Sequence, residues 1–524
     1  MGRHPPLRPF AAGDVWAVTA DEANAFDSWA IEAIGVPQPV LIENAGRAAA
    51  AVLHGLAPTG RVVGVVGAGN NGGDTLVALR TLAAWGRGVC ALLVADRPEA
   101  DPLLHGWPIE VVGDRALDQD GWRALLAGAD AVLDGILGTG ARGAPRARQA
   151  EAIERVNRDG GRVFAIDVPS GIDASTGGVP GAAIRADVTV SFGAPKVGAL
   201  VHPARALVGR QVVVEIGFPP LAAHAARVRV ITPAWARARF PVRDTDTHKN
   251  AVGRVLVVGG RVGMAGAAIL AGRGAFRAGA GMVRICSVAE NREPIQAAIP
   301  EALFVDASDQ AALIDAIAAS DALAVGPGLG TDDHAEKTLA AVLAASATPT
   351  VLDADALNLV ARPGAVDLTA VARSRPLLIT PHPGEMARLR GGEADLADDR
   401  IALARAAADR FGCVVLLKGA PSVVAEAGGI VSVDTQSSSD LAVAGMGDVL
   451  AGVCAGLMAQ GLDPSGAASV GLYLSGRAAR LAGRGASLTP SDVVRCLPDA
   501  RTENGEARTA FGLPFVTFDA DPAT

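Results

Sequence analysis

A glycine-rich turn, Gly67-Ala-Gly-Asn-Asn-Gly-Gly-Asp74, follows directly after the apolar run Arg61-Val-Val-Gly-Val-Val66. A buried strand, a glycine turn and a helix in this order are typical of α/β proteins that bind phosphate, because the helix N-terminus offers free N–H groups. The turn matches the G-x-G-x-x-G dinucleotide pattern, and Asp96 follows at about the expected distance of ~20 residues. However, a carboxylate at Asp74 would repel a pyrophosphate, so ordinary hydride transfer is not favoured. The side-chain oxygens of this turn suit a hard cation or the hydroxyl groups of a ligand.

Length and composition restrict the class of protein. A chain of 524 residues predicts two or three domains. Its net charge of −8 argues against general binding to nucleic acid or anionic membranes, so we expect neither partner. Met1–Val18 lacks the apolar core of a secretion signal, and the five cysteines form no C-x-x-C pair. We therefore expect a cytoplasmic protein, and one that forms homo-oligomers.

Two series of strand-like and helix-like runs predict two α/β domains. The first would be a Rossmann-like doubly wound sheet and the second a further βα series, separated by a Pro- and Arg-rich stretch near residue 228. We place the domains at 1–227 and 228–500, with an irregular tail at 501–524. Buried strands are predicted at Val62–Val66, Val89–Val94, Ala131–Leu137, Val163–Val168, Val188–Phe192, Ala322–Val325, Thr350–Asp353, Leu377–Ile379 and Val414–Leu417, and a hairpin at Ser422–Ala425 and Ile430–Val433.

Polar residues follow successive strands of the first half, at the sheet edge where α/β proteins bind ligands. The oxygens of Asn71, Asp134 and Ser170 could converge on one cation. Asp167 would remain free as a general base, and Lys196 would supply an ammonium as general acid or phosphate partner. Each turn alone could be an ordinary strand end, where such residues are common. Four such turns on successive strands favour a site.

Lysine is scarce, which draws attention to the lysines that remain. Only four of the 47 basic residues are lysines, at positions 196, 249, 337 and 418. A retained lysine can indicate that a compact ammonium is needed, although chance retention explains any single one. We expect Lys337 to lie on a solvent-exposed face of a helix.

The second half contains Ala444-Gly-Met-Gly-Asp448, which opens a helix of small residues. The N–H groups of Gly445–Gly447 could form an anion hole for a phosphoryl group, with Asp448 taking a proton from an attacking hydroxyl. A plain helix start with an acidic first turn is the alternative. Lys418 and Gly419 lie at the end of a predicted strand, where they could contact a nucleotide. Other predicted strand ends carry Gly326–Gly330, Asp353–Asn358, and Thr380–Glu385 with His382.

The motifs of the first half closely resemble the NAD(P)H-hydrate epimerase family. The resemblance rests on Glu43–Gly46, Asn70–Asp74, Asp134 with Gly138–Gly140, Asp167–Gly171 and Gly193–Lys196. It implies epimerisation at C6 of the hydrated nicotinamide ring and a K⁺ site at Asn71, Asp134 and Ser170. Thr75 stands where the family usually continues with glycine, which is harmless if that position is helical. The implied substrate-binding residues are Asn70, Asn71, Gly72, Gly73, Asp74, Gly138, Thr139, Gly140, Ala141, Arg142, Gly143, Ala144 and Asp167.

The second half resembles the ribokinase-like superfamily, and more narrowly its ADP-dependent NAD(P)H-hydrate dehydratase branch, over roughly residues 230 to 500. Further supporting motifs are His248-Lys249 and Met264–Ala267. The resemblance implies ADP as co-substrate with Mg²⁺, and products AMP and phosphate. Asp448 would help the ring hydroxyl attack the terminal phosphate of ADP. The hydrate would face Ala267, Gly328, His382 and Asp448, and the nucleotide would face Lys418, Gly419, Ala420, Pro421, Ser422 and Gly447.

Together the halves imply a bifunctional repair enzyme, because a dehydratase selective for one epimer needs an epimerase for the other. An ATP-dependent kinase of a small hydroxylated vitamin precursor is the enzymatic alternative, and it leaves the first half unexplained. A non-catalytic NAD-binding scaffold is the second alternative. The presence of Asp167, Lys196 and Asp448 argues against it. The sequence does not decide between ADP and ATP, or between NADH and NADPH hydrates.

Overall fold

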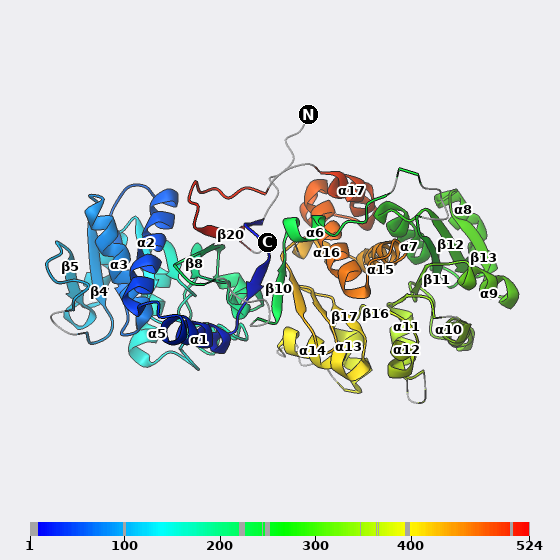
Figure 1. Cartoon of the computed structure of the whole chain (residues 1–524), viewed down its shortest axis with the longest axis horizontal. Coiled ribbons are helices and arrows are strands. Elements are labelled where there is room, and N and C mark those ends of the chain that lie inside the picture. Colours follow the sequence, from blue (N-terminus) through cyan, green and yellow to red (C-terminus); the bar gives the residue numbers. More distant parts are fainter. Residues whose placement is uncertain are drawn as a thin grey trace. The chain divides into compact units, whose positions relative to one another are not determined.

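The computed structural model of the chain describes residues 9–97, 101–219, 226–243, 245–246, 252–345, 347–362, 364, 366–392, 399–436, 438–503 and 507–522. These residues group into two compact units. The N-terminal unit holds the described residues of Leu7–Val230 and Ala507–Ala523, and the C-terminal unit holds those of Ile231–Glu506. Both are built on largely parallel sheets with intervening helices, which confirms the predicted α/β fold class (Figure 1).

The sheet of the N-terminal unit has the strand order β1-β20-β9-β8-β7-β6-β3-β4-β5. Neighbouring strands from β9 to β5 run parallel, whereas β20 is antiparallel to both β9 and β1. The strands are β1 (Phe10–Ala11), β3 (Val62–Val66), β4 (Val89–Leu93), β5 (Glu110–Gly113), β6 (Ala131–Gly135), β7 (Arg162–Ile166), β8 (Val188–Phe192), β9 (Arg210–Val214) and β20 (Val516–Ala520).

Helices cover both faces of this sheet, as the apolar pattern of β3 requires. Val62 and Val66 belong to one core cluster with residues of α2 and α3, and Val63 and Val65 belong to another with residues of α4 and α5. Successive strand residues point to opposite faces, so a strand that is apolar throughout must be covered twice. The helices are α1 (Ala20–Ser28), α2 (Gln38–Leu56), α3 (Asn70–Ala84), α4 (Gln119–Ala127) and α5 (Ala147–Asp159).

Two local findings concern the ends of this unit and its glycine turn. Strand β2 (Val15–Ala17), which leads into α1, pairs antiparallel with β10 (Val228–Ile231). Thr75 lies inside α3, where its hydroxyl donates to the carbonyl oxygen of Asn71 at 2.7 Å. The position is therefore helical and accepts a β-branched residue without a positive φ.

The prediction of an irregular tail at 501–524 is wrong in part. Helix α17 (Pro490–Thr502) runs past its start, and β20 lies within it. Val516 and Phe518 of β20 are buried, and the strand pairs with β9, about 300 residues earlier in the chain. A strand that depends on so distant a partner gives little local signal.

The sheet of the C-terminal unit has the order β13-β12-β11-β14-β15-β16-β17-β18-β19. Strands β13 to β17 are parallel, and β17, β18 and β19 follow one another antiparallel, which confirms the predicted hairpin. The strands are β11 (Arg254–Val258), β12 (Met282–Ser287), β13 (Leu303–Asp306), β14 (Ala322–Val325), β15 (Thr350–Leu352), β16 (Leu377–Ile379), β17 (Val414–Leu417), β18 (Val423–Ala425) and β19 (Val431–Asp434).

Helices α7 and α15 pack closely in this unit and set the position of the α15 N-terminus. A Cβ atom at Gly452 of α15 would lie 1.9 Å from the carbonyl oxygen of Ala271 in α7, so only glycine permits this approach. No helix among the described residues has the length and apolarity to cross a membrane. The helices are α6 (Pro233–Arg237), α7 (Ala265–Ala278), α8 (Arg292–Ala298), α9 (Gln310–Ala318), α10 (Asp333–Ala345), α11 (Asp355–Val360), α12 (Leu368–Ser374), α13 (Pro383–Arg390), α14 (Arg400–Phe411), α15 (Met446–Met458), α16 (Pro464–Ala482) and α17.

Candidate active sites

Asp167 follows β7 at the carboxyl edge of the first sheet, in a backbone conformation that favours glycine. Its φ is +64°, a region that costs a residue with a side chain about 1 kcal/mol or more. The neighbouring strand holds it there, because Asp167 N–H donates to Val190 O at 2.8 Å and Ser191 Oγ donates to Asp167 O at 2.8 Å. The Asp167 carboxylate also accepts from Phe192 N–H at 3.1 Å. The carboxyl group is therefore fixed in place.

Lys196 forms a buried ion pair with Asp167. Its Nζ donates to Asp167 Oδ1 and also to the carbonyl oxygens of Phe192, at 3.0 Å, and Ala194, at 3.3 Å. Lys196 is only 3% exposed, so these oxygens replace the water that its ammonium has lost. The structure thus brings together the two residues predicted as the acid and base of the first half.

A cavity of about 810 Å³ opens onto this pair, a volume in the usual range for small-molecule and cofactor sites. Most of the predicted substrate-binding residues line it: Asn70, Asn71, Asp74, Gly138, Thr139, Gly140, Ala141 and Asp167. Five predicted residues do not line it: Gly72, Gly73, Arg142, Gly143 and Ala144. Gly72 and Gly73 are buried in α3, and Arg142 donates instead to Asp21 of α1 at 2.6 Å.

The N-terminus of α3 faces this cavity without a side-chain cap. Its N-cap is Gly69, so the first N–H groups of the helix remain available to a ligand. A Cβ atom at Gly72 would lie 2.1 Å from Gly67 O, which explains the glycine there. Burial and the charge of Asp167 raise the pKa of Asp74 well above its usual value. This shift is toward the neutral carboxyl group, which weakens the repulsion of phosphate expected from the sequence.

The three residues predicted as cation ligands, Asn71, Asp134 and Ser170, lie close together, since Asn71 and Ser170 both contact Leu137 O and Ser170 contacts Asp134. Ser170 donates to Asp134 through both its N–H, at 2.8 Å, and its hydroxyl, at 2.6 Å. Asn71 Nδ2 lies 3.0 Å from Leu137 O and 2.6 Å from Ile166 O. Asp134 is 0% exposed, and burial raises its pKa to about 6. No Lys, Arg or His in the described part of the chain forms an ion pair with it.

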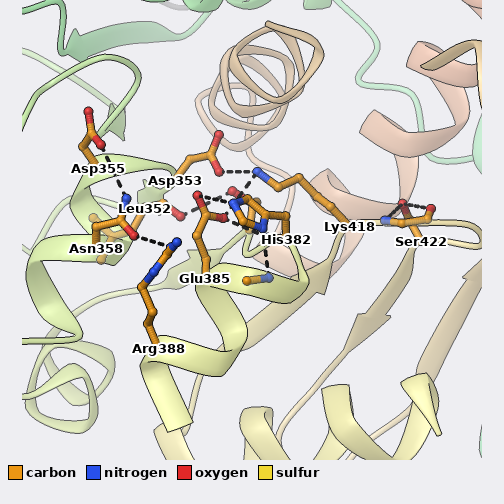
Figure 2. Close-up of polar contacts among 12 residues, drawn as sticks. Leu352, Asp353, Asp355, Asn358, His382, Glu385, Arg388, Lys418 and Ser422 are labelled. Carbon is orange, nitrogen blue, oxygen red and sulfur yellow. Dashed lines mark hydrogen bonds and ion pairs between the residues drawn. The ribbon is translucent and has the colours of Figure 1, made fainter. Parts of the chain in front are cut away.

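In the C-terminal unit, four side chains from separate strand ends and helices converge (Figure 2). Lys418 Nζ donates to Asp353 Oδ1 at 2.6 Å and lies 3.8 Å from Glu385 Oε2. Glu385 also accepts from His382 N–H at 2.8 Å in a capping box at the start of α13. Burial raises the pKa of Glu385 to about 7, whereas burial and the Lys418 charge lower the pKa of His382.

The N-terminus of α15 lies beside this cluster. Its N-cap, Gly445, has a φ of +91° and provides no side-chain cap, so the helix presents free N–H groups. A Cβ atom at Gly447 would lie 3.2 Å from Lys418 Nζ, which places this helix end next to the ammonium. Burial, reinforced by the charge of Asp353, raises the pKa of Asp448 to about 6. A carboxylate with a pKa near the working pH can act as a general base.

A second cavity, of about 500 Å³, is lined by most of the predicted nucleotide-binding residues: Lys418, Gly419, Ala420, Ser422 and Gly447, together with His382. Pro421, Asp448, Ala267 and Gly328 are not among its lining residues. Ala267 and Gly328 lie side by side, because a Cβ atom at Gly328 would be 3.0 Å from Ala267 Cβ. His248 and Lys249 lie outside the described residues.

Comparison with known proteins gives a consistent result for both units. The family model for NAD(P)H-hydrate dehydratase matches residues 255–498, and that for the YjeF-related protein N-terminus matches residues 38–198. A bifunctional NAD(P)H-hydrate repair enzyme of Moorella thermoacetica is 38% identical over 498 residues, covering 90% of this chain and 93% of that relative. The chain belongs to the bifunctional NAD(P)H-hydrate repair enzyme family.

Further members of this repair family align over most of their length. The enzyme of Salinibacter ruber is 37% identical and covers 94% of this chain and 97% of its own, and that of Escherichia coli is 35% identical with 88% of each covered. A solved structure of the ADP/ATP-dependent NAD(P)H-hydrate dehydratase of Bacillus subtilis, co-crystallized with ATP/Mg²⁺, is 30% identical. It covers 51% of this chain and 96% of its own, with a TM-score of 0.45.

Sequence reasoning missed two charged residues that line the first cavity, Asp27 and Glu215. Asp27, on α1, lines it together with Asp74, Asp167 and Lys196. No motif surrounds Asp27, and α1 carries three acidic residues, so nothing in the sequence singled it out. In the second site, the carboxylates of Asp353 and Glu385 were noted at strand ends. Their shared contact with Lys418 could be found only from the fold.

Among the described residues, no group of three His, Cys, Asp or Glu side chains is placed to hold a metal ion. This does not conflict with Mg²⁺ arriving on a nucleotide, because Mg²⁺ is commonly bound by one or two carboxylates together with substrate phosphates. The five cysteines are free thiols.

Proposed function

We propose that the chain repairs hydrated NAD(P)H through two activities. Residues 1–227 would interconvert the R and S hydrates, and residues 228–500 would dehydrate the S form with ADP. The observation that carries the proposal is the presence, in one chain of this family, of two separate sites. Each combines a helix that begins at a glycine with a lysine–aspartate ion pair whose carboxylate is buried. The kinase and scaffold alternatives explain only one site or neither.

At the first site, the hydrate would lie in the 810 Å³ cavity with its phosphates toward the N-terminus of α3. Epimerisation needs proton transfer at the C6 hydroxyl, and the fixed Asp167–Lys196 pair supplies an acceptor and a donor. Their hydrogen bonds to strand backbone hold both groups still, so little reorganisation is needed during the reaction.

A K⁺ ion would be held by Asn71, Asp134 and Ser170. A fully buried carboxylate with no cationic partner in the described part of the chain, beside a hydroxyl and carbonyl oxygens, is a donor set that suits a hard cation. The ion would neutralise Asp134 and fix the loop that follows β6, whose residues Gly138–Ala141 line the cavity.

At the second site, the terminal phosphate of ADP would lie against the N-terminus of α15 and Lys418. Asp448 would take the proton of the C6 hydroxyl as the hydroxyl oxygen attacks the β-phosphorus, with AMP leaving. Loss of phosphate from C6 and of a proton from C5 then forms the C5–C6 double bond of NAD(P)H. Mg²⁺, with Asp353 and Glu385 nearby, would offset the phosphate charge. These reaction steps balance with the hydrate and ADP as the only reactants.

The proposal is tested by separating the hydrates by chromatography after incubation with the full chain. Without nucleotide, pure R hydrate should become an R/S mixture and no NAD(P)H should form. Addition of ADP should then convert the whole mixture to NAD(P)H, with one AMP released per molecule. Unchanged R hydrate would contradict the epimerase half, and nucleotide-independent dehydration would contradict the other.

A further inference from the structure

Helix α1 lies outside the residues that either family model matches, yet it forms a wall of the first cavity. Five of its residues line that cavity: Ala23, Asn24, Phe26, Asp27 and Ser28. Asp27 is the only acidic residue among them. The chain therefore adds to the cavity a carboxyl group that does not come from the edge of the sheet.

The backbone that leads into α1 is tied to both neighbours of Lys196. Val18 N–H donates to Pro195 O at 3.0 Å, and Val197 N–H donates to Val18 O at 2.9 Å. Helix α1 begins two residues later, so its start is fixed relative to the Lys196 ammonium.

Further contacts fix the direction of α1. Thr19 forms a capping box with Glu22, and Ala20 N–H donates to Ser175 Oγ at 2.9 Å. At the other end, the ring of Phe26 lies 5.2 Å from the ring of Phe218, which also lines the cavity. A helix held at both ends keeps Asp27 in one place with respect to the Asp167–Lys196 pair.

Asp27 is chemically available. It is half-buried, and its carboxyl group has no hydrogen bond or ion pair to any residue that the structure describes. The other acidic groups of α1 are occupied, since Asp21 accepts from Arg142 and Glu22 from Thr19. Burial raises the pKa of Asp27 to about 6, opposed by Lys196 and reinforced by Asp167. The remaining charged groups lining the cavity are Asp74 and Glu215.

We infer that Asp27 is a catalytic proton donor of the epimerase, acting on the C6 hydroxyl of the hydrate. The inference rests on the proposed epimerase function. As the C6–O bond breaks, the ring nitrogen lone pair forms the C6=N1 bond, and the Asp27 proton leaves with the hydroxyl as water. Water then adds to the other side of C6, and the electron pair of the C6=N1 bond returns to nitrogen. The proton that this water loses restores the protonated carboxyl group of Asp27. No other reactant is consumed.

The test uses the full chain with the substitutions Asp27→Asn and, as a matched control, Glu32→Gln, an exposed acid beyond α1. Asp27→Asn should lower kcat/KM for conversion of R to S hydrate about 100-fold or more. Dehydration of pure S hydrate with ADP, measured on the same sample, should be unchanged. Glu32→Gln should leave both rates unchanged.

The pH profile distinguishes a proton donor from a merely structural residue. The wild-type kcat/KM for epimerisation should fall as pH rises above about 6, where Asp27 loses its proton. Asp27→Glu should still show this decrease of kcat/KM with pH, and Asp27→Asn should not. A wild-type profile flat from pH 5 to 8, or an Asp27→Asn rate within threefold of wild type, would overturn the inference. A wild-type chain that fails to interconvert the hydrates would instead overturn the proposed function.

Discussion

Lys418 and Asp353 form an ion pair in which Nζ and Oδ1 are 2.6 Å apart, and Asp353 is only 1% exposed. Ala354, directly after Asp353, has a φ of +49° and is the N-cap residue of α11. Gly447 lies against the same ammonium. The pair therefore fixes a positive charge at the helix end proposed to receive the phosphate.

Lys418→Met should reduce both activity and stability. Loss of the ammonium removes a phosphate contact and leaves the Asp353 carboxylate buried without a partner, which costs about 3–5 kcal/mol in comparable cases. We expect a lower melting temperature of the C-terminal unit and at least ~100-fold slower ADP-dependent dehydration. The double substitution Lys418→Met with Asp353→Asn should restore much of the stability and none of the activity. Lys337→Met, on the exposed face of α10, is the matched control.

Asp448→Asn should abolish dehydration while ADP still binds. The amide keeps the size of the side chain but cannot accept the hydroxyl proton, so the rate should fall about 10²–10⁴-fold. Calorimetric titration should give an ADP dissociation constant within a few-fold of wild type, and Asp333→Asn on α10 provides the control. Turnover close to wild type would rule out Asp448 as the base.

Dehydration should depend on pH in the direction opposite to epimerisation. Asp448 must be ionised to accept a proton, and its pKa is raised to about 6. As pH falls through that value the carboxylate is protonated, so kcat should decrease about tenfold per pH unit below 6 and level off above it. The rate of AMP formation from ADP with pure S hydrate, followed between pH 5 and 8, measures this pH dependence directly. A rate that increases on acidification would contradict the assignment.

Asp167→Asn should stop epimerisation and spare dehydration. The substitution removes the carboxylate charge that pairs with Lys196 and can take a proton, while keeping the shape of the side chain. We expect a ~10²-fold or larger loss in R-to-S conversion, with the S-hydrate dehydration rate unchanged. Asp120→Asn, an exposed position on α4, is the control. Parallel loss of both activities would mean that the two sites are not independent.

Potassium should stabilise the N-terminal unit through Asp134. Binding to the folded state alone raises stability by RT ln(1 + [K⁺]/Kd), about 2.7 kcal/mol when the concentration is 100 times Kd. Thermal melting in potassium chloride, compared with tetramethylammonium chloride at equal ionic strength, should show this increase for the wild type. Asp134→Asn should abolish the difference. Equal melting temperatures in both salts for the wild-type chain would exclude the cation site.

The buried centre of each sheet was predictable from the sequence. Val414–Leu417 is apolar throughout and Val188–Phe192 carries Val, Val and Phe at alternate positions, and these predicted limits agree with β17 and β8. Scarcity of lysine also identified Lys196 and Lys418, both of which form ion pairs with aspartate. These features are local in the sequence or stand out in composition.

Features that depend on distant partners were not predictable. Strand β5 is largely exposed at the sheet edge, and β20 pairs with β1 and β9, both far away in the sequence. Asp27 lines the first cavity because the segment before α1 forms backbone hydrogen bonds with the residues on either side of Lys196, some 180 residues later. No pattern within α1 records that contact.

The most direct test of the account is recovery of reduced-nicotinamide absorbance from a mixed R and S NADH hydrate, with ADP, Mg²⁺ and K⁺ present. One chain with both activities should restore the full absorbance, and Asp167→Asn should stop near the fraction supplied by the S form. Wild-type recovery that also stops at the S fraction, or proceeds without nucleotide, would contradict the central claim.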